Sequence, residues 1–127
     1  MDSLQGKKIL IVEDDRSLQA ALVEALKQEG CETVSAFDGE EGLEKFEKEK
    51  PDLILLDIIL PKKDGYDVLG EIKKNTDINI PVMILTNLEE VGNIQKALDL
   101  GAKTFMVKSD FSLKDIVEKI KENFLKA

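Results

Sequence analysis

Short apolar runs alternate with segments of helical periodicity from one end of the chain to the other. The runs that indicate strands cover residues 9–12, 32–36, 53–56, 82–85 and 104–107. The first, third and fourth runs are apolar on both faces, as strands covered by helices on each side must be. The second and fifth mix polar with apolar residues. We therefore expect three central strands and two edge strands.

Helical spacing fills the intervals between these runs. Gly30 and Gly101 are stop signals for the first and fourth helices, and Gly65 opens the third. Asp38 is expected to cap the second helix, with Glu41 three residues on. The apolar positions that mark the five helices are Leu18, Ala21, Leu22, Ala25 and Leu26; Leu43 and Phe46; Val68, Leu69 and Ile72; Ile94 and Leu98; and Leu113, Ile116, Val117, Ile120 and Phe124.

This alternation predicts an α/β fold, a doubly wound, flavodoxin-like (βα)5 domain with a five-stranded parallel sheet. Right-handed crossovers and the central placement of the apolar strands favour the order 2-1-3-4-5. No linker or repeat interrupts the pattern, so residues 1–127 are expected to form a single domain, without an output domain. In this order the ends of the first and third strands lie side by side.

Composition narrows the classes of function. The 127 residues are 43% apolar and 35% charged, which is typical of a globular domain. Eighteen basic against 26 acidic residues give a net charge of -8, which argues against direct nucleic-acid binding. The single Cys31 excludes an internal disulfide, and no apolar run approaches the length of a signal peptide or membrane span. A cytoplasmic protein is the expectation.

Polar residues end the strands at the edge where open α/β sheets place their sites. Glu13 and Asp14 follow the first strand and Asp57 the third, whereas Asp15 is interpreted as a helix cap. Clustered carboxylates repel one another unless a cation neutralises them. A hard divalent ion with oxygen ligands, Mg²⁺ or Mn²⁺, suits such a cluster. Thr86 ends the fourth strand and Lys108 the fifth, so the sequence predicts a site for a divalent cation and a phosphoryl group.

These residues resemble the response-regulator receiver domain of two-component signalling, the CheY-like family, over essentially the whole chain. The matching pieces are Ile9-Leu10-Ile11-Val12-Glu13-Asp14-Asp15, Asp57 with Pro61 and Gly65 downstream, Thr86, and Lys108 three residues after Phe105. Each piece alone is a weak signal. All of them in this order, in an alternating strand and helix pattern, are a strong one.

The resemblance implies a phosphorylation site with a bound metal. Asp57 would accept a phosphoryl group from a histidine kinase or a histidine phosphotransfer protein, and since the chain has no histidine the donor imidazole must be external. Asp14, Asp57 and the backbone carbonyl of Ile59 would ligate Mg²⁺, with Glu13 acting through water. Lys108 would balance charge on the phosphoryl oxygens.

The resemblance also implies a switch rather than an enzyme, one that assists its own phosphorylation and dephosphorylation. The Thr86 hydroxyl would bond the phosphoryl group and Phe105 would turn inward. The surface of the helix around 94–98, the strand 104–107 and the last helix would then change. A downstream protein would bind this surface, with a homodimer on phosphorylation as one outcome.

Two features depart from the family pattern. Ser109 stands where the family usually has a proline, so a trans peptide is expected after Lys108. Asn87 stands where a small residue is common. Alternative interpretations stay open: Thr86 as an ordinary strand-end hydroxyl, Phe105 as ordinary core, and the whole chain as a constitutive protein-interaction module that is never phosphorylated.

Overall fold

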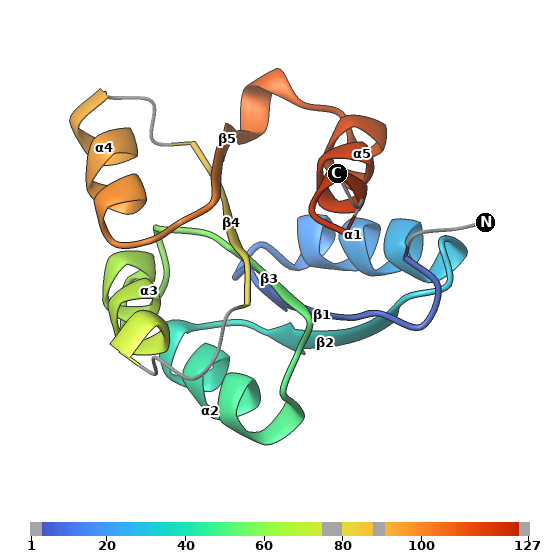
Figure 1. The fold of residues 1–127 in the computed structure, drawn as a ribbon, viewed down its shortest axis with the longest axis horizontal. Helices are drawn as coiled ribbons and strands as arrows, with labels where there is room; N and C mark the ends of the chain where they lie inside the picture. Colours follow the sequence, from blue (N-terminus) through green and yellow to red (C-terminus); the bar gives the residue numbers. More distant parts are fainter. Residues whose placement is uncertain (1–3, 75–79, 88–90, 125–127) are drawn as a thin grey trace.

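A five-stranded parallel sheet runs through the middle of the molecule in the order β2-β1-β3-β4-β5 (Figure 1). The computed structural model describes residues 4–74, 80–87 and 91–124. The strands are β1 Lys8–Val12, β2 Glu32–Ala36, β3 Leu53–Leu56, β4 Val82–Thr86 and β5 Thr104–Val107. The helices are α1 Arg16–Gln28, α2 Gly39–Glu49, α3 Gly65–Lys74, α4 Val91–Asp99 and α5 Leu113–Glu122, with a 3-10 turn over Lys108–Asp110.

This architecture confirms the predicted fold class and strand order. Strands β1, β3 and β4 are central, and β2 and β5 form the edges. The register pairs Val12 with Leu56, and the amide of Asp57 donates to the Val12 carbonyl at 3.0 Å. The residues that follow β1 and β3 are thus held next to each other at the carboxyl edge of the sheet.

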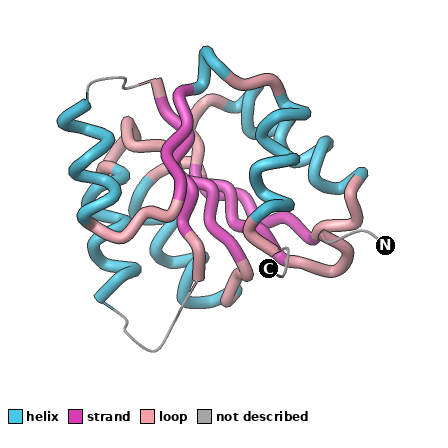
Figure 2. Tube along the Cα trace, turned by 45° about the horizontal axis from the view of Figure 1, so that its top comes forward, coloured by secondary structure: helices cyan, strands magenta, loops and turns pink. Residues whose placement is uncertain are grey.

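Helices cover both faces of the sheet, which explains why its central strands are apolar throughout (Figures 1 and 2). On one face, α1 and α5 bury residues such as Leu22, Leu26 and Ile120 against the sheet. On the other face, α2, α3 and α4 bury Phe46 and Leu69 among others. Among the described residues, no helix combines the length and the apolar character that crossing a bilayer requires.

The predicted helix caps are present. Asp15 caps α1, where its Oδ1 accepts from the amides of Ser17 and Leu18 at 3.0 and 3.2 Å. Asp38 caps α2 by accepting from the Glu41 amide at 2.8 Å. The interpretation of Asp15 as a cap rather than a ligand is therefore confirmed.

Two of the leucines that mark the predicted helices do not lie in the core. Leu98 in α4 is 42% exposed, and Leu113 at the start of α5 is 38% exposed. In α4 the small Ala97 is the residue fully buried against the sheet, which turns the neighbouring Leu98 outward. In α5 the buried face begins one turn after Leu113, at Ile116. The helices form as expected, but their orientation leaves two leucines facing outward.

Candidate functional site

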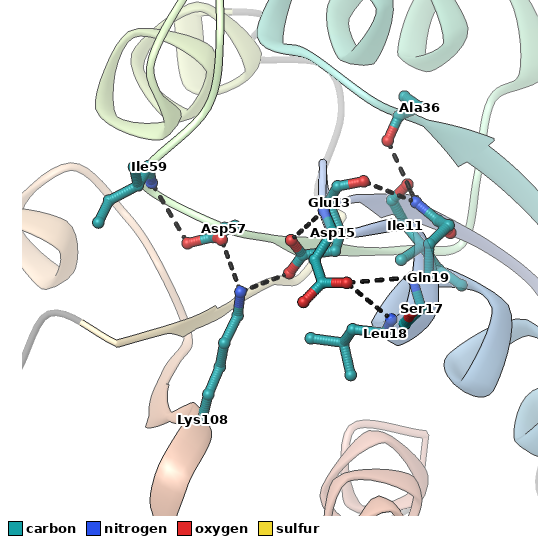
Figure 3. A network of polar contacts seen from close by, with 10 residues as sticks. All are labelled: Ile11, Glu13, Asp15, Ser17, Leu18, Gln19, Ala36, Asp57, Ile59 and Lys108. Carbon is teal, nitrogen blue, oxygen red and sulfur yellow. Dashed lines mark hydrogen bonds and ion pairs between the residues drawn. The ribbon is translucent and has the colours of Figure 1, made fainter.

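Three strands deliver charged side chains to one point at the carboxyl edge of the sheet (Figure 3). The ammonium of Lys108, after β5, lies 2.7 Å from Glu13 Oε1 and 2.8 Å from Asp57 Oδ2. Lys108 must reach past the end of β4 to make both contacts, since β5 is two strands away from β3. The convergence that the sequence predicted for Glu13, Asp57 and Lys108 is present, and one cation bridges two carboxylates.

The carboxylates form a compact acidic cluster. Glu13, Asp14 and Asp57 each offer an oxygen, and these oxygens lie within 4.8 Å of one another. Glu13 and Asp57 are buried, whereas Asp14 is exposed. A hard divalent cation prefers such oxygen donors and often retains waters on its open side. The donor set and its one exposed member fit Mg²⁺ or Mn²⁺.

Burial and charge pairing compete in this cluster. Burial raises the pKa of Glu13, and the hydrogen bond from Lys108 only partly offsets that effect. Burial acts to lower the pKa of Lys108, yet hydrogen bonds to Asp57 and Glu13 hold it above its ordinary value. Lys108 is therefore protonated at neutral pH and supplies the positive charge beside the two buried carboxylates.

The backbone of the following loop holds the other oxygen of Asp57. The Ile59 amide donates to Asp57 Oδ1 at 3.2 Å, while the Ile59 side chain is 56% exposed. The sequence singled out the carbonyl of Ile59 as a metal ligand and did not identify this amide contact. One carboxylate oxygen of Asp57 thus accepts a hydrogen bond from Lys108, and the other accepts one from the loop backbone.

Two glycines fix the path of that loop. The Gly65 amide donates to the Ile58 carbonyl at 2.7 Å, and a Cβ on Gly65 would overlap the Asp57 carbonyl oxygen and lie 2.6 Å from Ile58 Cα. A Cβ on Gly39, in α2, would overlap the carbonyl oxygen of Lys63. The sequence identified Gly65 as a helix start and as part of the family resemblance. In the structure, the absence of a Cβ at Gly65 lets α3 pack directly against the backbone of Asp57 and Ile58.

Thr86 ends β4 beside this cluster but takes no part in it. Its side chain is fully buried, and Oγ1 has no hydrogen-bond partner within the described part of the chain. Phe105 of β5 lies opposite Ile84 of β4 and packs, partly buried, against the core beneath α3 and α4. Asn87 is exposed. Beside the acidic cluster there is therefore a buried hydroxyl that makes no hydrogen bond within the described ranges.

The loop after Lys108 is compact despite the serine. No cis peptide occurs in the described ranges, so the expectation of a trans bond before Ser109 is confirmed. The 3-10 turn Lys108–Asp110 begins at the lysine itself. Replacing proline by serine therefore does not keep the ammonium from Glu13 and Asp57.

Gln19 is the polar residue that sequence reasoning missed. It lies on the buried face of α1 with Leu22 and Leu26 and is only 3% exposed. Its Nε2 donates to the carbonyls of Ile11, Glu13 and Ala36 at 3.1, 3.2 and 3.2 Å (Figure 3). A glutamine on the apolar stripe of a helix was the available signal, since a buried amide needs partners.

Fold and site together define a doubly wound α/β domain with a lysine-bridged acidic cluster at the carboxyl edge of its sheet. The family model described as "Response regulator receiver domain" matches residues 9–121. The chain belongs to this family.

Curated relatives agree. The chain is 43% identical over 118 residues to "Probable transcriptional regulator ycf27" of Cyanophora paradoxa, a match that covers 93% of this chain and 48% of that protein. It is 39% identical over 116 residues to "Alkaline phosphatase synthesis transcriptional regulatory protein PhoP" of Bacillus subtilis (strain 168), covering 91% and 48%. The chain spans about half the length of the curated relatives it matches.

Solved structures agree as well. A chain of the CheX-CheY-BeF3-Mg+2 complex from Borrelia burgdorferi superposes with a TM-score of 0.87 at 30% identity, covering 96% of this chain and 92% of that one. The BeF3-activated N-terminal receiver domain of Klebsiella pneumoniae RstA gives a TM-score of 0.86 at 28% identity, covering 94% and 99%. Five parallel strands and flanking helices are thus shared with receiver domains of known structure.

Proposed function

We propose that this chain is a phosphoacceptor receiver domain that takes a phosphoryl group onto Asp57 and thereby switches a protein-binding surface. The observation that carries the proposal is the Lys108 bridge, which places a partly buried ammonium 2.8 Å from Asp57 Oδ2 inside the acidic cluster. The donor is a phosphohistidine on a histidine kinase or a histidine phosphotransfer protein. Its imidazole comes from outside because the chain has no histidine.

In the transfer step a carboxylate oxygen of Asp57 attacks phosphorus. A new P–O bond forms as the P–N bond of the donor breaks, and the imidazole keeps the electron pair and takes a proton from solvent. Lys108, already paired with Asp57, balances the charge on the phosphoryl oxygens. Positioning and charge stabilisation dominate such a loose transition state, so few side chains are needed.

Asp14, Asp57 and the carbonyl of Ile59 would hold Mg²⁺ or Mn²⁺, with Glu13 acting through water. When bound, the cation supplies further positive charge for the phosphoryl oxygens. Support comes from the three clustered carboxylates and from the relative solved with BeF3 and Mg²⁺. Modest affinity is expected because few protein groups contribute.

The switch is proposed to run through Thr86 and Phe105. The Thr86 hydroxyl has no partner in the described part of the chain, and a phosphoryl oxygen on Asp57 gives it an acceptor. Movement of Thr86 then leaves space into which Phe105 turns. The output surface is formed by α4, β5 and α5. Leu98 and Leu113 face outward on it and suit a protein partner, either a downstream target or a second copy of the chain.

The decisive experiment is acyl-phosphate mapping. The protein is incubated with acetyl phosphate and Mg²⁺, and the modified residue is located by mass spectrometry. We expect label on Asp57, none with EDTA, and none in Asp57→Asn, whereas the matched control Asp67→Asn, an exposed aspartate of α3, labels normally. Full labelling of Asp57→Asn would refute the acceptor assignment. If the parent protein is not labelled, the alternative function, a constitutive protein-interaction module, is favoured. The cytoplasmic location remains a separate prediction that this experiment does not test.

A further inference from the structure

The buried amide of Gln19 connects three backbone carbonyls at the point where the acidic cluster begins. We propose that Gln19 is a positioning residue that fixes the backbone carrying Glu13 and Asp14 and so sets the affinity of the cluster for a divalent cation. This inference rests on the metal site of the proposed function. It concerns a residue of α1 that contributes no ligand itself.

The geometry gives the amide a single orientation. Ser35 Oγ donates to Gln19 Oε1 at 3.0 Å. Nε2 of Gln19 faces the carbonyls of Ile11, Glu13 and Ala36, as Figure 3 shows. The reverse orientation would point an oxygen at three oxygens. Because one NH2 group has two hydrogens for three acceptors, at least one hydrogen is shared, and distances of 3.1–3.2 Å fit sharing.

The contact with the Glu13 carbonyl matters most. That carbonyl belongs to the peptide unit that joins Glu13 to Asp14, so holding it fixes the backbone between the two carboxylates. The Ala36 carbonyl also accepts from the Glu13 amide at 3.0 Å. The Ala36 carbonyl at the end of β2 therefore accepts from both the Glu13 amide and the Gln19 side chain. Through its second contact, with the Glu13 carbonyl, Gln19 links the Glu13–Asp14 peptide to this end of β2.

The two carboxylates depend on this backbone in different ways. Glu13 is additionally held by Lys108 and by the Asp15 amide at 2.9 Å. Asp14 is exposed, so its direction follows from the peptide to which it is attached. Loss of the Gln19 amide should consequently act mainly on Asp14, the proposed direct ligand. Groups that orient metal ligands in this way commonly change metal affinity by about 10- to 100-fold.

The test compares Gln19→Met, which keeps the shape but removes the donors, with Leu22→Ala, one turn further along the same buried face of α1. Mg²⁺ alone is titrated into the metal-free full chain, and the dissociation constant is read from the NMR shifts of the Asp14 and Asp57 amides. Thermal unfolding in EDTA measures stability separately. We expect Gln19→Met to bind Mg²⁺ roughly ten-fold more weakly, and Leu22→Ala to bind like the parent although it is less stable.

The half-saturating Mg²⁺ concentration for phosphorylation by acetyl phosphate should rise in parallel, with the rate at saturating Mg²⁺ largely retained. Ser35→Ala removes only the bond that orients the amide and should weaken binding about three-fold, which keeps the test intact if Gln19→Met does not fold. Unchanged affinity in the folded variants, equal weakening in Leu22→Ala, or no Mg²⁺ binding by the parent would overturn the inference. A parent that binds Mg²⁺ in a Gln19-dependent way but never phosphorylates Asp57 would refute the proposed function alone.

Discussion

The charged part and the neutral part of the site are built in opposite ways. Around Glu13 and Asp57, buried oxygens are matched by donors from Lys108, Ile59 and the Asp15 amide. At the adjacent end of β4, the Thr86 hydroxyl is just as buried but has no partner in the described part of the chain. An unpaired buried hydroxyl costs about 1–3 kcal/mol.

This difference indicates which half of the site can form new hydrogen bonds when a phosphoryl group is added. The carboxylates of the charged half already have hydrogen-bond partners, so a phosphoryl group there must compete with existing contacts. The Thr86 hydroxyl would form a new hydrogen bond without giving one up in the described part of the chain. We infer that the charged half sets whether Asp57 reacts, and that Thr86 sets whether the rest of the domain senses the reaction.

The largest effect is expected from Lys108→Met, which leaves Glu13 and Asp57 buried without their shared cation. Removing one partner of a buried ion pair costs about 3–5 kcal/mol, and the partial exposure of Lys108 places the expected loss near the lower end. Urea unfolding in EDTA at neutral pH measures it. The control Lys62→Met removes an exposed lysine 3.7 Å from Asp38 and should cost little. Equal, small losses would mean that the charged half is not held by Lys108.

Asp14→Ala should come next in size. We expect Mg²⁺ binding to weaken at least ten-fold, about 1.4 kcal/mol, because the only exposed member of the cluster is lost. Stability without metal should barely change. Isothermal titration of parent and variant is the measurement, with Asp15→Asn, at the α1 cap, as the neighbouring control. Equal affinity of Asp14→Ala and the parent would place the metal elsewhere.

Thr86→Val tests the neutral part of the site, the buried hydroxyl at the end of β4. It keeps the branched shape and removes a hydroxyl that has no partner among the described residues, so the unphosphorylated protein should gain about 1 kcal/mol in unfolding free energy. Thr33→Val on the edge strand β2 should be nearly neutral.

The same Thr86→Val variant tests the switch. With beryllofluoride and Mg²⁺, the parent should show amide NMR shifts across α4, β5 and α5, whereas the variant should show shifts only beside Asp57. If the distant shifts persist in Thr86→Val, the switch takes another route. If the variant loses stability, the hydroxyl has a partner after all.

The smallest effect concerns pH. Because burial raises the pKa of Glu13 above its ordinary 4.5, the folded state takes up this proton more readily than the unfolded chain. The stability contributed by Glu13 is thus fully present below pH 4.5 and is lost as pH rises through the raised value. Relative to Glu13→Gln, the parent should gain stability as pH falls from 7 towards 4.5. Urea unfolding in EDTA across this range checks the sign, and a constant difference would contradict it.

Sequence reasoning located the fold and the charged half well because both follow from local signals. Strands β2, β3 and β5 have the predicted bounds, and Glu13, Asp57 and Lys108 meet because parallel strands end at one edge. It was harder to predict from the sequence which side chains of a helix face the sheet. The pattern of α4 contains Leu98 and Ala97, and only packing against the sheet decides that alanine faces inward.

Two important contacts that the sequence did not predict depend on backbone atoms. Gln19 binds carbonyls from β1 and β2, and Ile59 offers an amide to Asp57. Every residue except proline carries the same backbone donor and acceptor, so residue types do not identify which backbone groups will be partners. The glutamine on the apolar stripe signals only that its amide needs partners. The unpaired state of the Thr86 hydroxyl is likewise a property of its surroundings and not of threonine.

The two glycine contacts around the loop after Asp57 bear on how such a domain diversifies. Gly39 and Gly65 grip the loop by its main chain, at Lys63 and at Asp57–Ile58, while the side chains of Ile59 and Lys62 face outward. Side chains at these outward positions can therefore be exchanged without moving the Asp57 carboxylate. Sequence drift at these outward positions would change the surface of the rim and leave the backbone of the site in place, provided that the two glycines remain.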